Sequence, residues 1–209
     1  MDTATIWRHI HAERQTLAAT LADLSPADWD LPSLCAGWSV KDVAAHVISN
    51  PQIGWGAMPG MLARNLGRGY NTMIFREVRR LGAASTPRSV LDDFAAHRTS
   101  TRHVPTTTVV EPLIDALVHH QDIVRALGRA HEMPPEAAAM AADRCRMLAG
   151  LMGSRQVVRG ARLVATDVDW TRGRGPTITG PMQELLMLCA GRGRVARELS
   201  GDGLELAPW

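Results

Sequence analysis

The sequence predicts a mainly α-helical protein, with a helical bundle over residues 1–153 and a small α+β domain over residues 154–209. Through the first part, apolar residues recur three and four positions apart, which is the spacing of an amphipathic helix. After residue 160, short runs instead look extended and are separated by glycine turns. Hydrophobic residues make up 45% and charged residues 21% of the 209 positions, so the chain can bury a core without disulfides.

The first two helices are marked by the residues at their ends. Isoleucines and leucines at helical spacing predict a helix over Thr3–Leu24, and Ser25–Pro26 ends it. Ser39 suits the N-cap of a second helix over Val40–Asn50, because Asp42 three residues later can complete a capping box. Both helices have an apolar face, so both are expected to pack on a shared core.

The remaining elements follow from the same signals, with proline and glycine breaking or ending them. Further helices are expected over Trp55–Leu81 (broken at Pro59 and best formed over Thr72–Leu81), Pro87–His97, Val109–Leu127 and Pro134–Met152. In the small domain we expect strands over Arg162–Thr166, Thr177–Thr179 and Gly203–Leu206, an extended segment at Val168–Trp170, a turn over Gly173–Pro176 and a helix from Pro181.

Charge and cysteine patterns exclude several classes of function. The net charge is +2, and acids alternate with arginines instead of forming a basic stripe, so no nucleic-acid partner is expected. No run approaches the roughly 18 apolar residues of a membrane span, and the charged start of the chain does not read as a signal peptide. Cys35, Cys145 and Cys189 form no C-x-x-C pair, which indicates reduced thiols and a cytoplasmic location.

One helix carries a spacing typical of metal ligands. Asp115, His119 and Asp122 lie four and three residues apart, so they share a helix face. A carboxylate and an imidazole one turn apart can converge on one cation, but a third ligand must come from elsewhere in the fold. His46 is the candidate, because it lies on an otherwise apolar face of the second helix.

Other interpretations of these residues stay open at this level. A histidine on an apolar face also fits a core residue that is hydrogen-bonded to a neighbour. Asp122 also fits a surface acid paired with Arg125 three residues on. His120 points about 100° away from His119 around the helix, so packing or a partner surface is its expected role. Trp38, at the start of a helix, is expected in the core.

The segment Leu34–Val47 contains the pattern C-x-G-W-[ST]-V-x-D-V-x-x-H, in which His46 is the final histidine. It resembles the signature of the mycothiol-dependent maleylpyruvate isomerase family, which belongs to the DinB-like metalloenzymes. A second motif of that family, a carboxylate followed by histidine and then aspartate, matches Asp115–Asp122. The small domain is similar at Ala165–Trp170 and Gly180–Pro181, so the likeness covers nearly the whole chain.

The resemblance implies a DinB-like four-helix bundle that binds a divalent metal, with zinc the ion expected, through His46, Asp115 and His119. The family usually has glutamate where Asp115 stands, so the shorter side chain is expected to shift the site, loosen the metal or change the ion. Glu111, two turns before His119, is a less well-placed substitute. Asp122 would accept a hydrogen bond from a ligand imidazole and fix its tautomer.

The implied activity is that of a thiol-using transferase or isomerase. The metal would activate the thiol of mycothiol, and the thiolate would add to a small electrophile. Arg192 is expected to be the catalytic arginine that holds an anionic group, although a surface position also fits it.

Two rival classes remain: a non-catalytic metal- or ligand-binding protein, which the Asp115 substitution favours, and a structural helical interaction module. In the second, the helix from Met133 to Met152 would form the face of a homodimer. Metal content and thiol-dependent turnover distinguish these classes.

Overall fold

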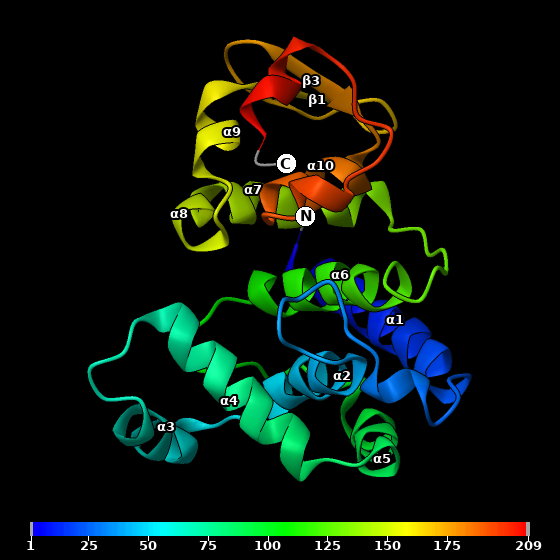
Figure 1. The fold of residues 1–209 in the computed structure, drawn as a ribbon, viewed down its shortest axis with the longest axis vertical. Helices are drawn as coiled ribbons and strands as arrows, with labels where there is room; N and C mark the ends of the chain where they lie inside the picture. Colours follow the sequence, from blue (N-terminus) through cyan, green and yellow to red (C-terminus); the bar gives the residue numbers. More distant parts are fainter. Residues whose placement is uncertain (1, 208–209) are drawn as a thin grey trace. The chain divides into compact units, whose positions relative to one another are not determined.

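A computed structural model describes residues 2–207, and the chain divides into two compact units, Met1–His131 and Glu132–Trp209 (Figure 1). We treat the units separately. The division falls before the boundary expected at residue 153, and the helix Pro135–Met147 packs on a helix of the second unit. In the described part of the chain, every helix is too short or too polar to cross a membrane.

The first unit is a four-helix bundle, as predicted. Its helices α1, α2, α5 and α6 form a closed ring of contacts, in which α1 and α2 each pack against both α5 and α6. Helix α4 covers α2 from outside, and the short α3 precedes it (Figure 1). The bounds are Thr3–Ala22 for α1, Val40–Ser49 for α2, Met58–Arg64 for α3, Tyr70–Ala84 for α4, Pro87–His97 for α5 and Val110–Val124 for α6.

Apolar side chains from all four bundle helices meet in one core. Leu17 and Leu21 from α1, Val43 from α2, Phe94 from α5 and Ile123 from α6 are at most 1% exposed. Fully burying a side chain of this size contributes about 1.5–3 kcal/mol relative to leaving it in water. The bundle is therefore held mainly by apolar packing, which fixes how α2 and α6 face each other.

The start of α2 is fixed by polar contacts. The Ser39 hydroxyl accepts from the Asp42 amide at 3.2 Å, and Asp42 Oδ2 accepts from the Ser39 amide at 2.8 Å, which confirms the predicted capping box. The Asp42 carboxylate also accepts a hydrogen bond from Arg79 Nη1 on α4 at 2.6 Å. A Cβ built on Gly82 of α4 would clash with the same carboxylate and lie 3.1 Å from its Cα. Helices α2 and α4 therefore pack this closely only because residue 82 is glycine.

The second unit is the small α+β part. Strand β1 lies centrally in the order β2-β1-β3, antiparallel to β2 and parallel to β3. Helix α7 packs on α10, burying the alanine-rich face that was considered for a homodimer. The bounds are Pro135–Met147 for α7, Ala149–Met152 for α8, Arg155–Gly160 for α9, Arg162–Ala165 for β1, Thr171–Gly173 for β2, Thr177–Gly180 for β3 and Met182–Cys189 for α10.

The predicted last strand at Gly203–Leu206 is wrong, because the segment forms a 3-10 helix over Asp202–Leu206. Asp202 Oδ1 accepts from the Thr177 amide at 2.7 Å, at the start of β3, where a pairing strand would otherwise supply an acceptor. Strand-like pairing near this segment is limited, among the described residues, to one isolated antiparallel bridge between Thr179 and Ser200. The extended segment expected at Val168–Trp170 is not part of a strand, since β2 begins at Thr171.

We expect Gly82→Ala to destabilise the first unit by about 2 kcal/mol, because the new methyl group displaces the Asp42 carboxylate that caps α2. The loss should exceed the gain of about 1 kcal/mol that alanine gives in a helix. Urea unfolding measures both effects. Gly150→Ala is the matched control, since a Cβ at this helical glycine meets nothing within 4 Å. Equal stability of the two variants would contradict the close α2–α4 packing.

Candidate metal centre

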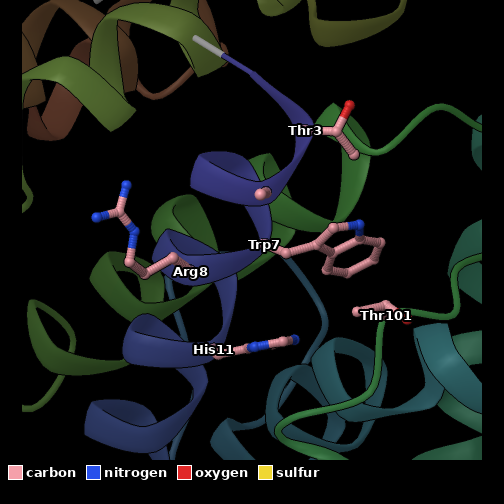
Figure 2. A pocket seen from close by; sticks show the side chains of 6 residues that line it. Thr3, Trp7, Arg8, His11 and Thr101 are labelled. Carbon is pink, nitrogen blue, oxygen red and sulfur yellow. The ribbon is translucent and has the colours of Figure 1, made fainter.

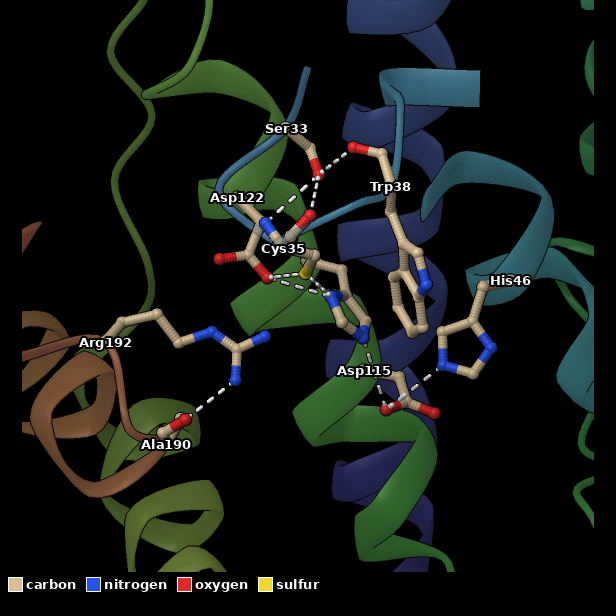
Figure 3. Close-up of polar contacts among 9 residues, drawn as sticks. Ser33, Cys35, Trp38, His46, Asp115, Asp122, Ala190 and Arg192 are labelled. Carbon is tan, nitrogen blue, oxygen red and sulfur yellow. Dashed lines mark hydrogen bonds and ion pairs between the residues drawn. The ribbon is translucent and has the colours of Figure 1, made fainter. Parts of the chain in front are cut away.

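Helices α2 and α6 bring the three predicted ligands together. Asp115 Oδ1 lies 4.0 Å from His46 Nε2 and 3.9 Å from His119 Nε2, and the two imidazole rings are 5.1 Å apart at an edge-to-face angle (Figure 3). One ligand atom from each of the three residues lies within 4.8 Å of the others. These separations are too long for hydrogen bonds, so the three atoms surround a shared point without bonding to one another.

The ligand atoms are selected by contacts on their far sides. His119 Nδ1 lies 2.9 Å from Asp122 Oδ2, which leaves Nε2 to face Asp115. Asn50 Nδ2 donates to Asp115 Oδ2 at 2.8 Å, which leaves Oδ1 to face the imidazoles. Such outer contacts fix the tautomer and orientation of metal-binding side chains.

The two histidines are held in different protonation states. Burial lowers the pKa of His46 to about 4, against the opposing charge of Asp115, so its imidazole is neutral at pH 7. Burial also acts to lower the pKa of His119, but the charges and hydrogen bonds of Cys35 and Asp122 outweigh it and raise this pKa to about 10. A cation that binds His119 Nε2 must therefore displace a proton.

Cys35 lies beside this pair, a contact that sequence reasoning missed. Its Sγ donates to Asp122 Oδ2 at 3.0 Å and lies 3.6 Å from His119 Nδ1. The loop that carries it is fixed to α6, because the Leu34 amide donates to the Asp122 carbonyl at 3.1 Å. The signal was available in the cysteine that opens the C-x-G-W motif, but spacing does not tell which helix that cysteine will face.

Trp38 forms a wall of the site, in addition to the core role expected for it. Its ring centroid lies 5.6 Å from that of His46 and 6.0 Å from that of His119 (Figure 3). The indole N–H is buried, and no described residue accepts a hydrogen bond from it. The ring thus covers one side of the two imidazoles, while the side chains of His46 and Asp115 are 18% and 24% exposed.

Arg14 on α1 adds a buried positive charge to the bundle. The residue is fully buried, and Nη1 donates to the Ser100 carbonyl at 3.2 Å. Burial lowers the pKa of Arg14 to about 10, and the negative charge of Asp115 opposes this shift. The guanidinium therefore remains charged at neutral pH.

The side chains therefore fit a divalent cation. The donors would be the lone pairs of two imidazoles and one carboxylate oxygen, which is a set that zinc accepts in catalytic sites. The environment keeps His46 neutral and orients His119, as metal binding requires. Three protein ligands leave a coordination position for a small molecule.

Other residues considered from the sequence lie elsewhere. Asp122 is fully buried on His119, so the alternative of a surface acid is wrong. Glu111 accepts from the Thr108 amide at 2.8 Å, in the first turn of α6, and does not join the cluster. Arg192 belongs to the second unit, where Nη1 donates to the Ala190 carbonyl at 2.7 Å, and its catalytic role stays a prediction.

A separate cavity of about 690 Å³ opens along the first half of α1. The Trp7 and His11 rings point toward it, with centroids 5.8 Å apart (Figure 2). The residues that line it are Thr3, Ala4, Trp7, Arg8, His11 and Thr101. None of the three candidate ligands contributes to this cavity, so it does not form part of the metal-type cluster.

The fold and the cluster define a helical-bundle protein with a metal-type ligand set between two helices. Residues 10–124 match the family model described as the mycothiol maleylpyruvate isomerase N-terminal domain, and the chain belongs to this family. The suspected family is thus confirmed.

Solved structures share the fold along the full chain. A mycothiol-dependent maleylpyruvate isomerase is 15% identical with a TM-score of 0.66, and its histidine-to-alanine mutant is 14% identical with a TM-score of 0.65. Each comparison covers 100% of this chain and 98% of the other. At this identity the likeness establishes the fold alone. No curated protein gives a significant match.

We expect Asp122→Asn to destabilise the metal-free protein by about 3 kcal/mol, because a buried charged pair loses one partner. The folded pKa of His119, about 10, lies above its ordinary value of 6.5. The contribution of the pair is therefore complete below about pH 6.5 and is lost as the pH rises through about 10. Urea unfolding with a chelator at pH 6, 8 and 10 measures the difference. A deficit that does not shrink with rising pH would contradict the pairing.

Proposed function

We propose that this chain is a divalent-metal-dependent enzyme that uses a low-molecular-weight thiol, mycothiol. It would act as a transferase, which adds the thiol to a small electrophile, or as an isomerase of that electrophile. The observation that carries the proposal is the convergence of His46, Asp115 and His119 on one point between α2 and α6. Membership of the mycothiol maleylpyruvate isomerase family supports the thiol and the reaction class. Zinc is the expected ion, because two imidazoles and a carboxylate are among its usual catalytic ligands.

When bound, the cation would lower the pKa of a thiol, so that a thiolate exists near neutral pH. The protein's own groups prepare the place for this chemistry. His46 offers a neutral nitrogen, Asp115 offers one oxygen while Asn50 occupies the other, and Asp122 orients His119. The Trp38 ring packs beside both imidazoles.

Arg192 completes the proposal as the catalytic arginine. Its guanidinium can bind a carboxylate through two parallel hydrogen bonds, which suits an anionic group on the electrophile. The support is the position of Arg192 in the family resemblance, after α10 in the small unit. A small electrophile and a thiol are the proposed partners, in the cytoplasm, with no role for nucleic acid or a membrane. A second copy of the chain is proposed as the protein partner, in a homodimer.

A metal- or ligand-binding protein without turnover is the second candidate. The favouring observation is Asp115 itself, where the family usually has glutamate. Its Oδ1 lies 3.9–4.0 Å from both imidazole nitrogens, so the aspartate still reaches the shared point. This geometry supports a ligand role for Asp115 in both candidates. A measurement of thiol-dependent turnover distinguishes the enzyme from the binding protein.

We expect His46→Ala and His119→Ala each to lower divalent-metal affinity by at least about 100-fold, since a three-ligand site loses most of its affinity with one ligand. Zinc titration of chelator-treated protein, with calorimetry, measures the change. His97→Ala is the matched control, because this α5 histidine lies outside every metal-type group in the described chain. Full affinity in either ligand variant would remove the site assignment.

We expect the zinc-loaded protein to accelerate the addition of mycothiol to small electrophiles at least about tenfold over the metal-stripped protein, because the thiolate fraction rises. An electrophile panel at equal mycothiol concentration, followed by loss of free thiol, measures the rate. Arg192→Lys should raise KM for carboxylate-bearing electrophiles more than for neutral ones. Equal rates of mycothiol addition with and without metal would contradict the enzyme and favour a binding protein without turnover.

A further inference from the structure

Helix α6 carries a second polar cluster on a different face from the candidate metal centre. His120 is fully buried against α1, where its Nδ1 lies 2.7 Å from Glu13 Oε1. His131, beyond the end of α6, places its Nε2 2.7 Å from the same oxygen. The two imidazole rings stack with centroids 3.9 Å apart. Two imidazoles and a carboxylate from three separate segments thus meet at one buried point, within the first unit.

The arrangement around this cluster selects the ligand atoms. Thr20 Oγ1 lies 3.1 Å from His120 Nε2, so the far nitrogen is engaged and Nδ1 is left to face Glu13. Gln121 Nε2 donates to the His131 carbonyl at 2.7 Å, which fixes the backbone that carries the second imidazole. Metal-binding histidines typically have a hydrogen-bond partner on the ring nitrogen that does not bind the ion, as Thr20 is for His120.

The three side chains have a donor set that zinc uses in catalytic sites, two imidazoles and one carboxylate. Hydrogen bonds now join the ligand atoms directly, so a cation would replace the shared protons. Zinc–ligand bonds of about 2.0–2.2 Å require each nitrogen–oxygen pair to separate by about half an ångström. His131 can supply this movement, because it lies outside a helix and its side chain is 14% exposed, whereas that of His120 is fully buried.

We propose that Glu13, His120 and His131 form a second divalent-metal site of the zinc type, which shares no ligand with the group His46, Asp115 and His119. The exposed edge of His131 gives an ion a route from solvent. Its occupation would tie the segment after α6 to α1, because Glu13 belongs to α1 and His131 follows α6.

The test counts metal ions in chelator-treated full-length protein titrated with Zn²⁺, and again with Co²⁺, whose absorption reports coordination. We expect two equivalents for the wild type and one for the first-site variant His46→Ala/Asp115→Asn. Glu13→Gln and His131→Gln should each weaken the second equivalent at least tenfold and the first by much less. His97→Gln is the matched control, with the same substitution at a histidine outside both clusters.

The outcomes separate this site from the proposed function. If the first-site variant binds no metal, or if Glu13→Gln and His131→Gln leave both equivalents intact, the cluster is a hydrogen-bonded network only and the proposal is overturned. If wild type binds one equivalent that only the Glu13 and His131 variants lose, the second site stands and the first fails. Because His131 lies outside a helix and its side chain is partly exposed, glutamine fits there without a clash, and His131→Gln alone decides the matter where Glu13→Gln does not fold.

Discussion

The packing of α2 against α6 is the contact on which the candidate site depends. Apolar residues such as Val43 and Ile123 bury their side chains within the bundle and set the distance between the helices. His46 and His119 then face each other across this contact, in surroundings where an unpaired polar group costs several kcal/mol. Hydrogen bonds from Asn50 and to Asp122 satisfy the far sides of the polar groups. Their near sides remain turned toward one shared point, which is the property expected of a metal site.

Much of this arrangement could be predicted from local sequence. Ser39 and Asp42 marked the start of α2 because a capping box acts within one turn, and the spacing from Asp115 to His119 defined one face of α6. That His46 would face the same point did not follow from periodicity. Its apolar helix face made His46 a candidate, and the resemblance to a family then indicated it as a ligand, since a local pattern does not say which helices pack together.

What sequence reasoning missed depends on contacts between distant segments. Cys35 reaches Asp122 from a loop 87 positions away, and His131 reaches Glu13 across 118 positions. The same cause explains the wrong strand at Gly203–Leu206. The alternation of residues there fits a strand, but Asp202 supplies the acceptor that Thr177 needs, and the segment closes into a 3-10 helix. Contacts between distant segments also decide where the compact units divide, since the partner of α7 is α10, more than thirty positions later in the chain.

Helix α6 is under an unusual constraint, because two adjacent residues face different neighbouring helices. His119 faces α2 and His120 faces α1, about 100° apart around the helix. A rotation of α6 that improved one contact would therefore spoil the other, and both imidazoles are too deeply buried to be left without partners. The Glu13–His120–His131 contacts thus help to fix the rotation of α6, and with it the direction in which Asp115 and His119 present their ligand atoms. Whether Glu13 holds protons or a metal ion between the two imidazoles, the cluster on one side of α6 supports the geometry of the site on the other.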